Sequence, residues 1–110
     1  MAIKLVAERK FTHRVKVQTP VDGGHKEETL KVTYRVLDAV AVEAFDLATT
    51  EGTTDFLREV ISHLDDIVGE DNAPIPYSDE LRDEVLKVPY IRAALGRGYF
   101  EAIGKGRKGN

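Results

Sequence analysis

The stretch Phe11-Thr-His-Arg-Val-Lys-Val-Gln-Thr19 decides the fold of this chain. Its apolar residues alternate with polar ones, which is typical of a β-strand with one buried face. The stretch Thr29-Leu-Lys-Val-Thr-Tyr-Arg-Val36 repeats the same period of two. We therefore expect two strands that pair antiparallel. The connection at residues 20–28 contains an Asp-Gly-Gly sequence but is longer than a tight turn, so it is predicted to be a mobile loop.

The pattern changes on both sides of this hairpin. Upstream, Ile3-Lys-Leu-Val6 either adds a third short strand or packs loosely. Downstream, Asp38 is predicted to cap a helix that ends near Gly52. Thr53 or Thr54 is then predicted to cap a second helix. The apolar stripe of that helix consists of Phe56, Leu57, Val60, Ile61 and Leu64.

The remaining sequence predicts an irregular connection and two more helices. Residues 65–77 contain Gly and two Pro in a polar surround, which indicates irregular structure. Ser78 is placed to cap a third helix, and Pro89 suits the first turn of a fourth. The predicted fold class is a single α+β domain. An N-terminal arm or strand (1–10) precedes the β-hairpin (11–36), which packs on a part with about four helices (38–104) before a flexible basic tail (105–110).

Two glycines interrupt the last predicted helix, and each costs about 1 kcal/mol relative to alanine in a helix interior. Gly98 lies on one face with Ala94 and Ala102, so these small residues allow another backbone to approach closely. That backbone belongs either to the same chain or to a second copy or partner. Gly96 points away from this row. The candidate residues for partner binding or self-association are Arg92, Ala94, Gly98, Ala102, Lys105, Arg107 and Lys108.

Composition limits the classes of protein to consider. A chain of 110 residues with 42% hydrophobic residues suits one small core. Because the chain has no cysteine, disulfides and thiolate metal sites are excluded, which fits a reducing compartment. The first apolar run is too short for a signal peptide or a membrane span. These features predict a soluble intracellular protein.

Charge is segregated along the sequence. Residues 1–37 carry eight Lys and Arg against four acids, residues 38–84 carry two against fourteen, and residues 85–110 carry six against one. Complementary patches steer association, so this pattern favours contact between copies. The acidic middle and the pI of about 5.6 argue against nucleic-acid binding. A small nucleic-acid-binding regulator that uses Lys105, Arg107 and Lys108 nevertheless stays an alternative.

The residues do not form a recognisable catalytic pattern. His13, His25 and His63 fall on a strand, a loop and a helix of the predicted structure. Only Glu59 and His63 have a helical spacing that could share a metal ion. The glycines of the C-terminal segment lack the spacing and the Ser or Thr of a phosphate-binding loop. The sequence therefore predicts a protein that is not an enzyme and has no catalytic, metal-binding or cofactor-binding residues.

The order of short motifs resembles one family, the tail assembly chaperones of long-tailed phages. The motifs are Phe11-x-x-x-Val-x-Val, Thr-Tyr-Arg-Val at 33–36, Phe-Leu-Arg-Glu-Val at 56–60, Pro-Ile-Pro-Tyr-Ser-Asp-Glu-Leu at 74–81, and Arg-Ala-Ala-Leu-x-x-x-Tyr-x-Glu-Ala-Ile-Gly at 92–104. The resemblance extends over nearly the whole chain, and it depends on the order of the motifs and on the C-terminal segment.

The resemblance implies an assembly factor made in the cytoplasm of an infected bacterium and absent from the mature virion. Such chaperones bind the long helical tape measure protein, keep it soluble and recruit tail tube subunits while they self-associate. Many are made in two forms, the longer by ribosomal frameshifting, and this chain would be the short form. A structural tail or connector subunit is the alternative within the same setting.

Overall fold

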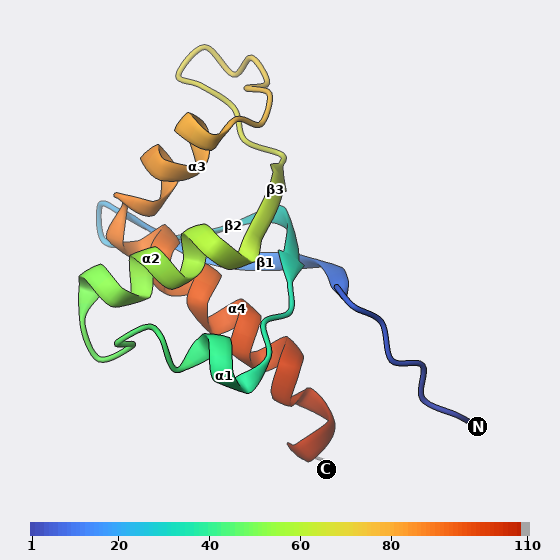
Figure 1. The fold of residues 1–110 in the computed structure, drawn as a ribbon. Coiled ribbons are helices and arrows are strands. Elements are labelled where there is room, and N and C mark those ends of the chain that lie inside the picture. Colours follow the sequence, from blue (N-terminus) through green and yellow to red (C-terminus); the bar gives the residue numbers. More distant parts are fainter. Residues whose placement is uncertain (109–110) are drawn as a thin grey trace.

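A three-stranded antiparallel sheet forms one layer of the computed structural model, and helices cover one of its faces (Figure 1). The structure describes residues 1–108, but only the backbone of 105–108. The strands are β1 (Lys10–Val21), β2 (Gly24–Arg35) and β3 (Ile61–Asp65), in the order β1-β2-β3. This arrangement confirms the predicted α+β class with an N-terminal hairpin and a third strand.

The hairpin is longer and its turn tighter than the sequence pattern predicts. Val21 pairs with Gly24, so that Asp22 and Gly23 alone form the turn. Gly23 adopts a φ of +81°, a conformation that costs glycine little. The expected mobile loop over residues 20–28 is therefore wrong. Turn residues that tolerate positive φ allow the two strands to pair to the end of the ladder.

The third strand comes from a segment that the sequence pattern assigns to a helix. Residues 61–65 pair antiparallel with β2, and a bulge between Thr33 and Tyr34 shifts the register. The bulge lets Ile61 and Leu64, three residues apart, both point into the core. An apolar spacing of three mimics a helix, which explains the wrong prediction. The N-terminal segment Ile3–Val6 forms no strand.

The predicted first helix is shortened to α1 (Ala39–Val42). Asp38 caps it as predicted, with its Oδ1 accepting a hydrogen bond from the Ala41 backbone N at 2.8 Å. The second helix, α2 (Thr50–Val60), begins earlier than expected because Thr49, rather than Thr53 or Thr54, is its N-cap. The Thr49 Oγ1 accepts a hydrogen bond from the Gly52 backbone N at 2.9 Å, and such a contact favours a helix start.

The last two helices begin where the sequence predicts. Ser78 caps α3 (Asp79–Leu86), and Pro89 is the first residue of α4 (Pro89–Lys108). The core lies between the sheet and these helices. Its fully buried large side chains are Val32, Tyr34, Phe56, Leu57, Val60, Ile61, Leu64, Leu86 and Leu95. Helix α4 packs mainly on β1, so the last helix closes the core over the first strand.

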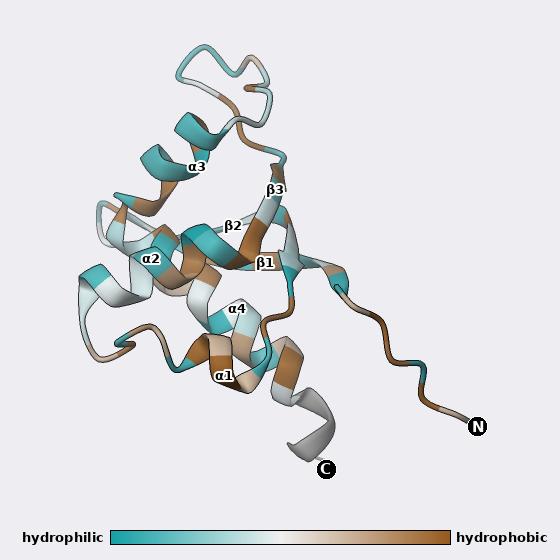
Figure 2. Cartoon of the chain, viewed as in Figure 1, coloured by the Kyte–Doolittle hydropathy of each residue, from teal (hydrophilic) through white to brown (hydrophobic). Residues whose placement is uncertain are grey.

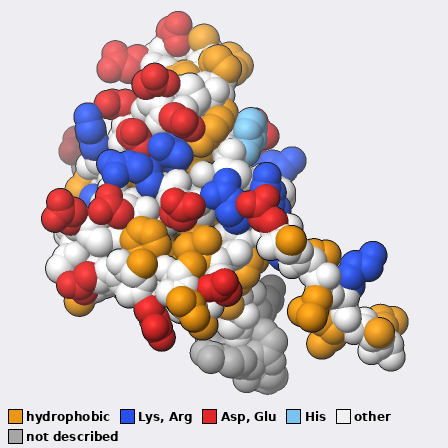
Figure 3. Space-filling view, viewed as in Figure 1, with side chains coloured by type: hydrophobic (Ala, Val, Ile, Leu, Met, Phe, Trp, Pro, Cys, Tyr) orange, Lys and Arg blue, Asp and Glu red, His pale blue; other side chains and the backbone are white. Residues whose placement is uncertain are grey.

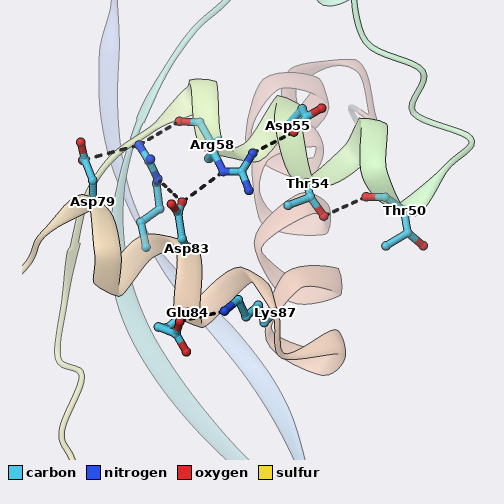
Figure 4. Close-up of polar contacts among 9 residues, drawn as sticks. Thr50, Thr54, Asp55, Arg58, Asp79, Asp83, Glu84 and Lys87 are labelled. Atoms are coloured by element: carbon cyan, nitrogen blue, oxygen red, sulfur yellow. Dashed lines mark hydrogen bonds and ion pairs between the residues drawn. The ribbon is translucent and has the colours of Figure 1, made fainter.

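Two arginines tie α2 to α3 and neutralise part of the acidic middle of the chain (Figure 4). Arg58 contacts Asp55 of its own helix at 2.9 Å and Asp83 of α3 at 3.1 Å. Arg82 contacts Asp83 at 3.1 Å and Asp79 at 3.6 Å. These carboxylates therefore bind arginines of the same chain while they stay in contact with solvent.

Replacing Asp83 with asparagine should give a small, pH-dependent loss of stability. Partial burial raises the pKa of Asp83, but the contacts with Arg82 and Arg58 outweigh it and hold the pKa below its ordinary value of 3.8. The contribution is therefore present above pH 3.8 and lost as the pH falls through the lowered pKa. We expect a loss of less than about 1 kcal/mol at neutral pH, because the groups are partly exposed.

Urea unfolding of Asp83→Asn at neutral and strongly acidic pH checks this expectation. Glu84→Gln is the matched control, since Glu84 contacts Lys87 on the surface of the same helix. An equal loss for Asp83→Asn at both pH values would contradict the role of the carboxylate charge.

Candidate functional site

The three histidines lie apart on the sheet. His13 is half-buried on β1, and His25 is exposed on β2. His63 lies on β3 rather than on a helix, so its expected helical spacing with Glu59 does not exist. Its Nε2 lies 3.1 Å from Asp65 Oδ1. Over the described residues, no three His, Cys, Asp or Glu side chains come together in a way that could hold a metal ion.

The predicted row of small residues packs partly on the chain's own sheet. Ala94 and Gly98 are buried, and a Cβ added at Gly98 would lie 2.9 Å from Val15 Cγ2 and 3.0 Å from Tyr34 Oη. The close approach also positions Tyr34, whose hydroxyl donates to the backbone O of Leu95 at 2.6 Å. Burial raises the pKa of Tyr34, so the hydroxyl keeps its proton. Ala94 and Gly98 therefore pack against the sheet of the same chain. This is one of the two alternatives from the sequence, the other being a contact with a second copy or a partner.

The other predicted partner-binding residues do not form one surface in the described part of the chain. Arg92 is half-buried and donates to the backbone O of Leu86 at 3.2 Å, where it satisfies the end of α3. Ala102 is half-buried near the other end of α4. The side chains of Lys105, Arg107 and Lys108 lie outside the described part of the structure. The predicted flexibility of the tail (105–110) therefore stays a prediction.

An exposed apolar surface lies where α1 meets the second half of α4. The Leu37 backbone N, just before α1, donates to the Tyr99 hydroxyl of α4 at 3.3 Å, so the two segments are neighbours. Figure 2 shows hydrophobic residues on both helices. We call this surface the α1–α4 patch. The name stands for four exposed large hydrophobic residues of these segments: Val40 of α1, Leu47 of the loop that follows α1, and Phe100 and Ile103 of α4.

The α1–α4 patch rests on a rigid base and has an acidic margin. Phe100 stacks on Phe56, whose buried ring lies 5.5 Å away at an angle of 10°. Val40 is 79% exposed and stands at the tip of α1. Asp38, Glu43 and Asp46 are exposed on the same segment, and Figure 3 shows carboxylates around the hydrophobic side chains. The patch suits a partner with an apolar stripe flanked by cations.

The patch was not predicted because the sequence indicates a first helix from Asp38 to near Gly52, longer than the four residues of α1. The early end of α1 leaves Val40 in solvent. Phe100 follows the buried Tyr99 and lies off the face that carries Ala94 and Gly98. An aromatic residue at that helical position is the one signal in the sequence that points to this surface.

A second candidate surface is a groove between β1 and α4. Strand β1 is an edge strand, and no other described strand pairs with its outer side. The groove has a volume of about 440 Å³. Its lining consists of His13, Arg14, Val15, Lys16 and Gln18 from β1, and Ala94, Arg97, Gly98 and Glu101 from α4. It therefore includes two of the predicted partner-binding residues, Ala94 and Gly98.

The face of the sheet that points away from the helices is basic. Lys10, Lys16 and Lys31 lie on it together with Arg14 and Arg35. Both arginines pair with carboxylates of the same chain, since Arg14 lies 3.2 Å from Asp66 and Arg35 lies 3.2 Å from Glu8. No Phe, Tyr or Trp side chain of the described strands stands on this face to stack on a base. The arrangement gives little support to nucleic-acid binding.

No protein family model, curated protein or solved structure matches this chain. Within the described residues, the helices are too short or too polar to cross a membrane. The two surfaces themselves are therefore the basis for a functional proposal.

Proposed function

We propose that this protein is a tail assembly chaperone of a long-tailed phage, acting in the cytoplasm of the infected bacterium. It binds the helical tape measure protein, keeps it soluble and recruits tail tube subunits while copies of the chaperone associate. The order of sequence motifs from Phe11 to Gly104 motivates the family. The α1–α4 patch is the structural observation that carries the proposal.

The chemistry of the patch supports a helical client. Three aliphatic side chains and one aromatic ring, the latter stacked on the buried Phe56, can receive side chains at helical spacing. Acidic residues at the margin favour a client helix with lysine or arginine beside its apolar stripe. A chaperone needs such a surface and no reacting group.

Charged substitutions in the patch should weaken client binding without unfolding the protein. Val40→Lys and Ile103→Lys place a cation on exposed positions, so the core is not touched. We expect each to weaken binding about tenfold or more, because the apolar contact is lost. To measure the effect, each variant is co-expressed with the tape measure protein encoded in the same gene cluster. The fraction of the tape measure protein that stays soluble is then determined.

Val68→Lys is the matched control, because Val68 is an exposed hydrophobic residue in the loop between β3 and α3. It should keep the tape measure protein soluble. If the unsubstituted chain leaves that protein insoluble, the chaperone function is wrong. Finding the chain in purified virions would instead favour the structural tail or connector subunit.

A further inference from the structure

We propose that the groove between β1 and α4 receives the N-terminal arm of a second copy of this chain as an added β-strand. The inference deepens the self-association part of the proposed function, but it rests on contacts that are separate from the α1–α4 patch. The apolar part of the arm is Met1–Val6.

The backbone of β1 is open to an added strand. In the hairpin register, Val21 pairs with Gly24 across the turn and the Val36 N donates to the Arg9 O at 2.8 Å. Odd-numbered residues of β1 therefore bond to β2, and even-numbered residues direct their N–H and C=O groups outward. Arg14, Lys16 and Gln18 are even-numbered and line the groove. An added strand would satisfy these groups.

Pro20 marks the limit of this open edge. It also occupies an even position, so its missing N–H faces outward and costs the hairpin no hydrogen bond. Proline at an edge blocks further pairing. The pairing segment therefore extends from Thr12 to Gln18, about 23 Å for seven extended residues.

The arm has the properties of a strand that lacks its partner. Ile3 is 91% exposed and Leu5 is 95% exposed, although both are apolar. Lys4 separates them, so the two apolar side chains would share one face of an extended strand, and Figure 2 shows a mainly hydrophobic arm interrupted by a hydrophilic stretch. Its six residues span about 20 Å when extended, which is one residue shorter than the pairing segment. Lys4 can also meet Glu101, which lines the groove.

The structure directs the arm away from the groove of its own molecule (Figure 1). The Arg9 O accepts from the Val36 N, and Glu8 Oε2 lies 3.2 Å from Arg35 Nε. These contacts hold residues 8 and 9 beside the end of β2, and the chain bends at Ala7 and Glu8. Folding the arm back on its own β1 would require a reversal at this point. A second copy meets no such obstacle.

The groove floor is shaped for such an insertion. Ala94 and Gly98 present little side chain, and the long side chains that α4 adds to the lining, Arg97 and Glu101, are exposed. Ile3 and Leu5 would leave water on binding. In this arrangement Ala94 and Gly98 would contact the added strand of the second copy, which is the partner-binding role that the sequence predicts for them.

The test is the mass of the protein in solution by light scattering at high concentration. The unsubstituted chain should form dimers or larger assemblies, and these should persist in high salt because apolar and backbone contacts hold them. Ile3→Lys with Leu5→Lys should raise the dissociation constant about tenfold or more. Val40→Lys is the control and should leave the mass unchanged. A monomer under all conditions would overturn the proposal.

Cross-linking between two differently substituted chains gives a second readout that does not depend on the stability of the variants. Because the chain has no cysteine, a mixture of Ile3→Cys and Gln18→Cys proteins can join only at these positions. A short bifunctional thiol reagent should produce a mixed dimer. Assemblies that form without this product, or that dissolve in salt, would overturn the arm exchange in favour of charge pairing.

The two proposals fail separately. The arm variant should still keep the tape measure protein soluble, whereas Val40→Lys should lose that activity and still self-associate. Loss of both properties in the arm variant, with the fold intact, would contradict the separation of the two surfaces.

Discussion

Replacing Phe56 with alanine is expected to lower the free energy of unfolding by about 3–5 kcal/mol. The side chain is fully buried. Its ring lies 5.7 Å from Phe45, 5.2 Å from Tyr99 and 5.5 Å from Phe100, measured between ring centroids. Alanine would leave a cavity that these aromatic rings cannot fill together, because two of them are fixed on α4.

Urea unfolding followed by far-ultraviolet circular dichroism measures this effect. Phe100→Ala is the control, since its ring belongs to the same cluster but is 45% exposed. We expect that variant to lose about 1 kcal/mol of unfolding free energy, because the exposed part of the Phe100 ring is already in contact with water in the folded protein. Equal losses for the two variants would show that Phe56 is not the centre of the cluster.

The second large effect concerns the two glycines of α4, whose replacement by alanine should act in opposite directions. At Gly98 a new Cβ meets Val15 Cγ2 at 2.9 Å and Tyr34 Oη at 3.0 Å. The valine is stiff and the hydroxyl is held by Leu95, so neither can move cheaply. We expect Gly98→Ala to destabilise the protein by about 1–3 kcal/mol.

At Gly96 there is room for the added methyl group. The nearest heavy atom is Leu57 Cδ1 at 4.0 Å, so Gly96→Ala gains helix propensity without a clash. We expect a stabilisation of about 0.5–1 kcal/mol. Thermal and urea unfolding of both variants provide the comparison. A stable Gly98→Ala protein would mean that α4 can move away from β1, contrary to the close packing described above.

Local signals in the sequence predict much of this fold. The alternation in residues 11–19 and 29–36 predicts the hairpin, and Asp38, Ser78 and Pro89 mark helix starts correctly because capping depends on neighbouring residues. The third strand was missed because a bulge places Ile61 and Leu64 on one face. That bulge depends on pairing with β2, which local spacing does not reveal.

The candidate surfaces depend even more on tertiary structure. The open edge of β1 exists because β3 joins the sheet beside β2, so strand order decides which backbone groups stay unpaired. Similarly, Val40 reaches solvent because α1 stops after four residues. The row of small residues in α4 was recognised, but the sequence could not decide between its own sheet and a partner. The structure shows the sheet contact directly.

The packing of α4 on β1 has a consequence for synthesis on the ribosome. Strand β1 leaves the exit tunnel early, but Leu95 and Tyr99, which cover the sheet, are added about eighty residues later. Until then α4 cannot cover β1, and only earlier elements such as α2 can shield the inner face of the hairpin. Slow codons just before Pro89 would prolong that vulnerable interval and lower the yield of native protein.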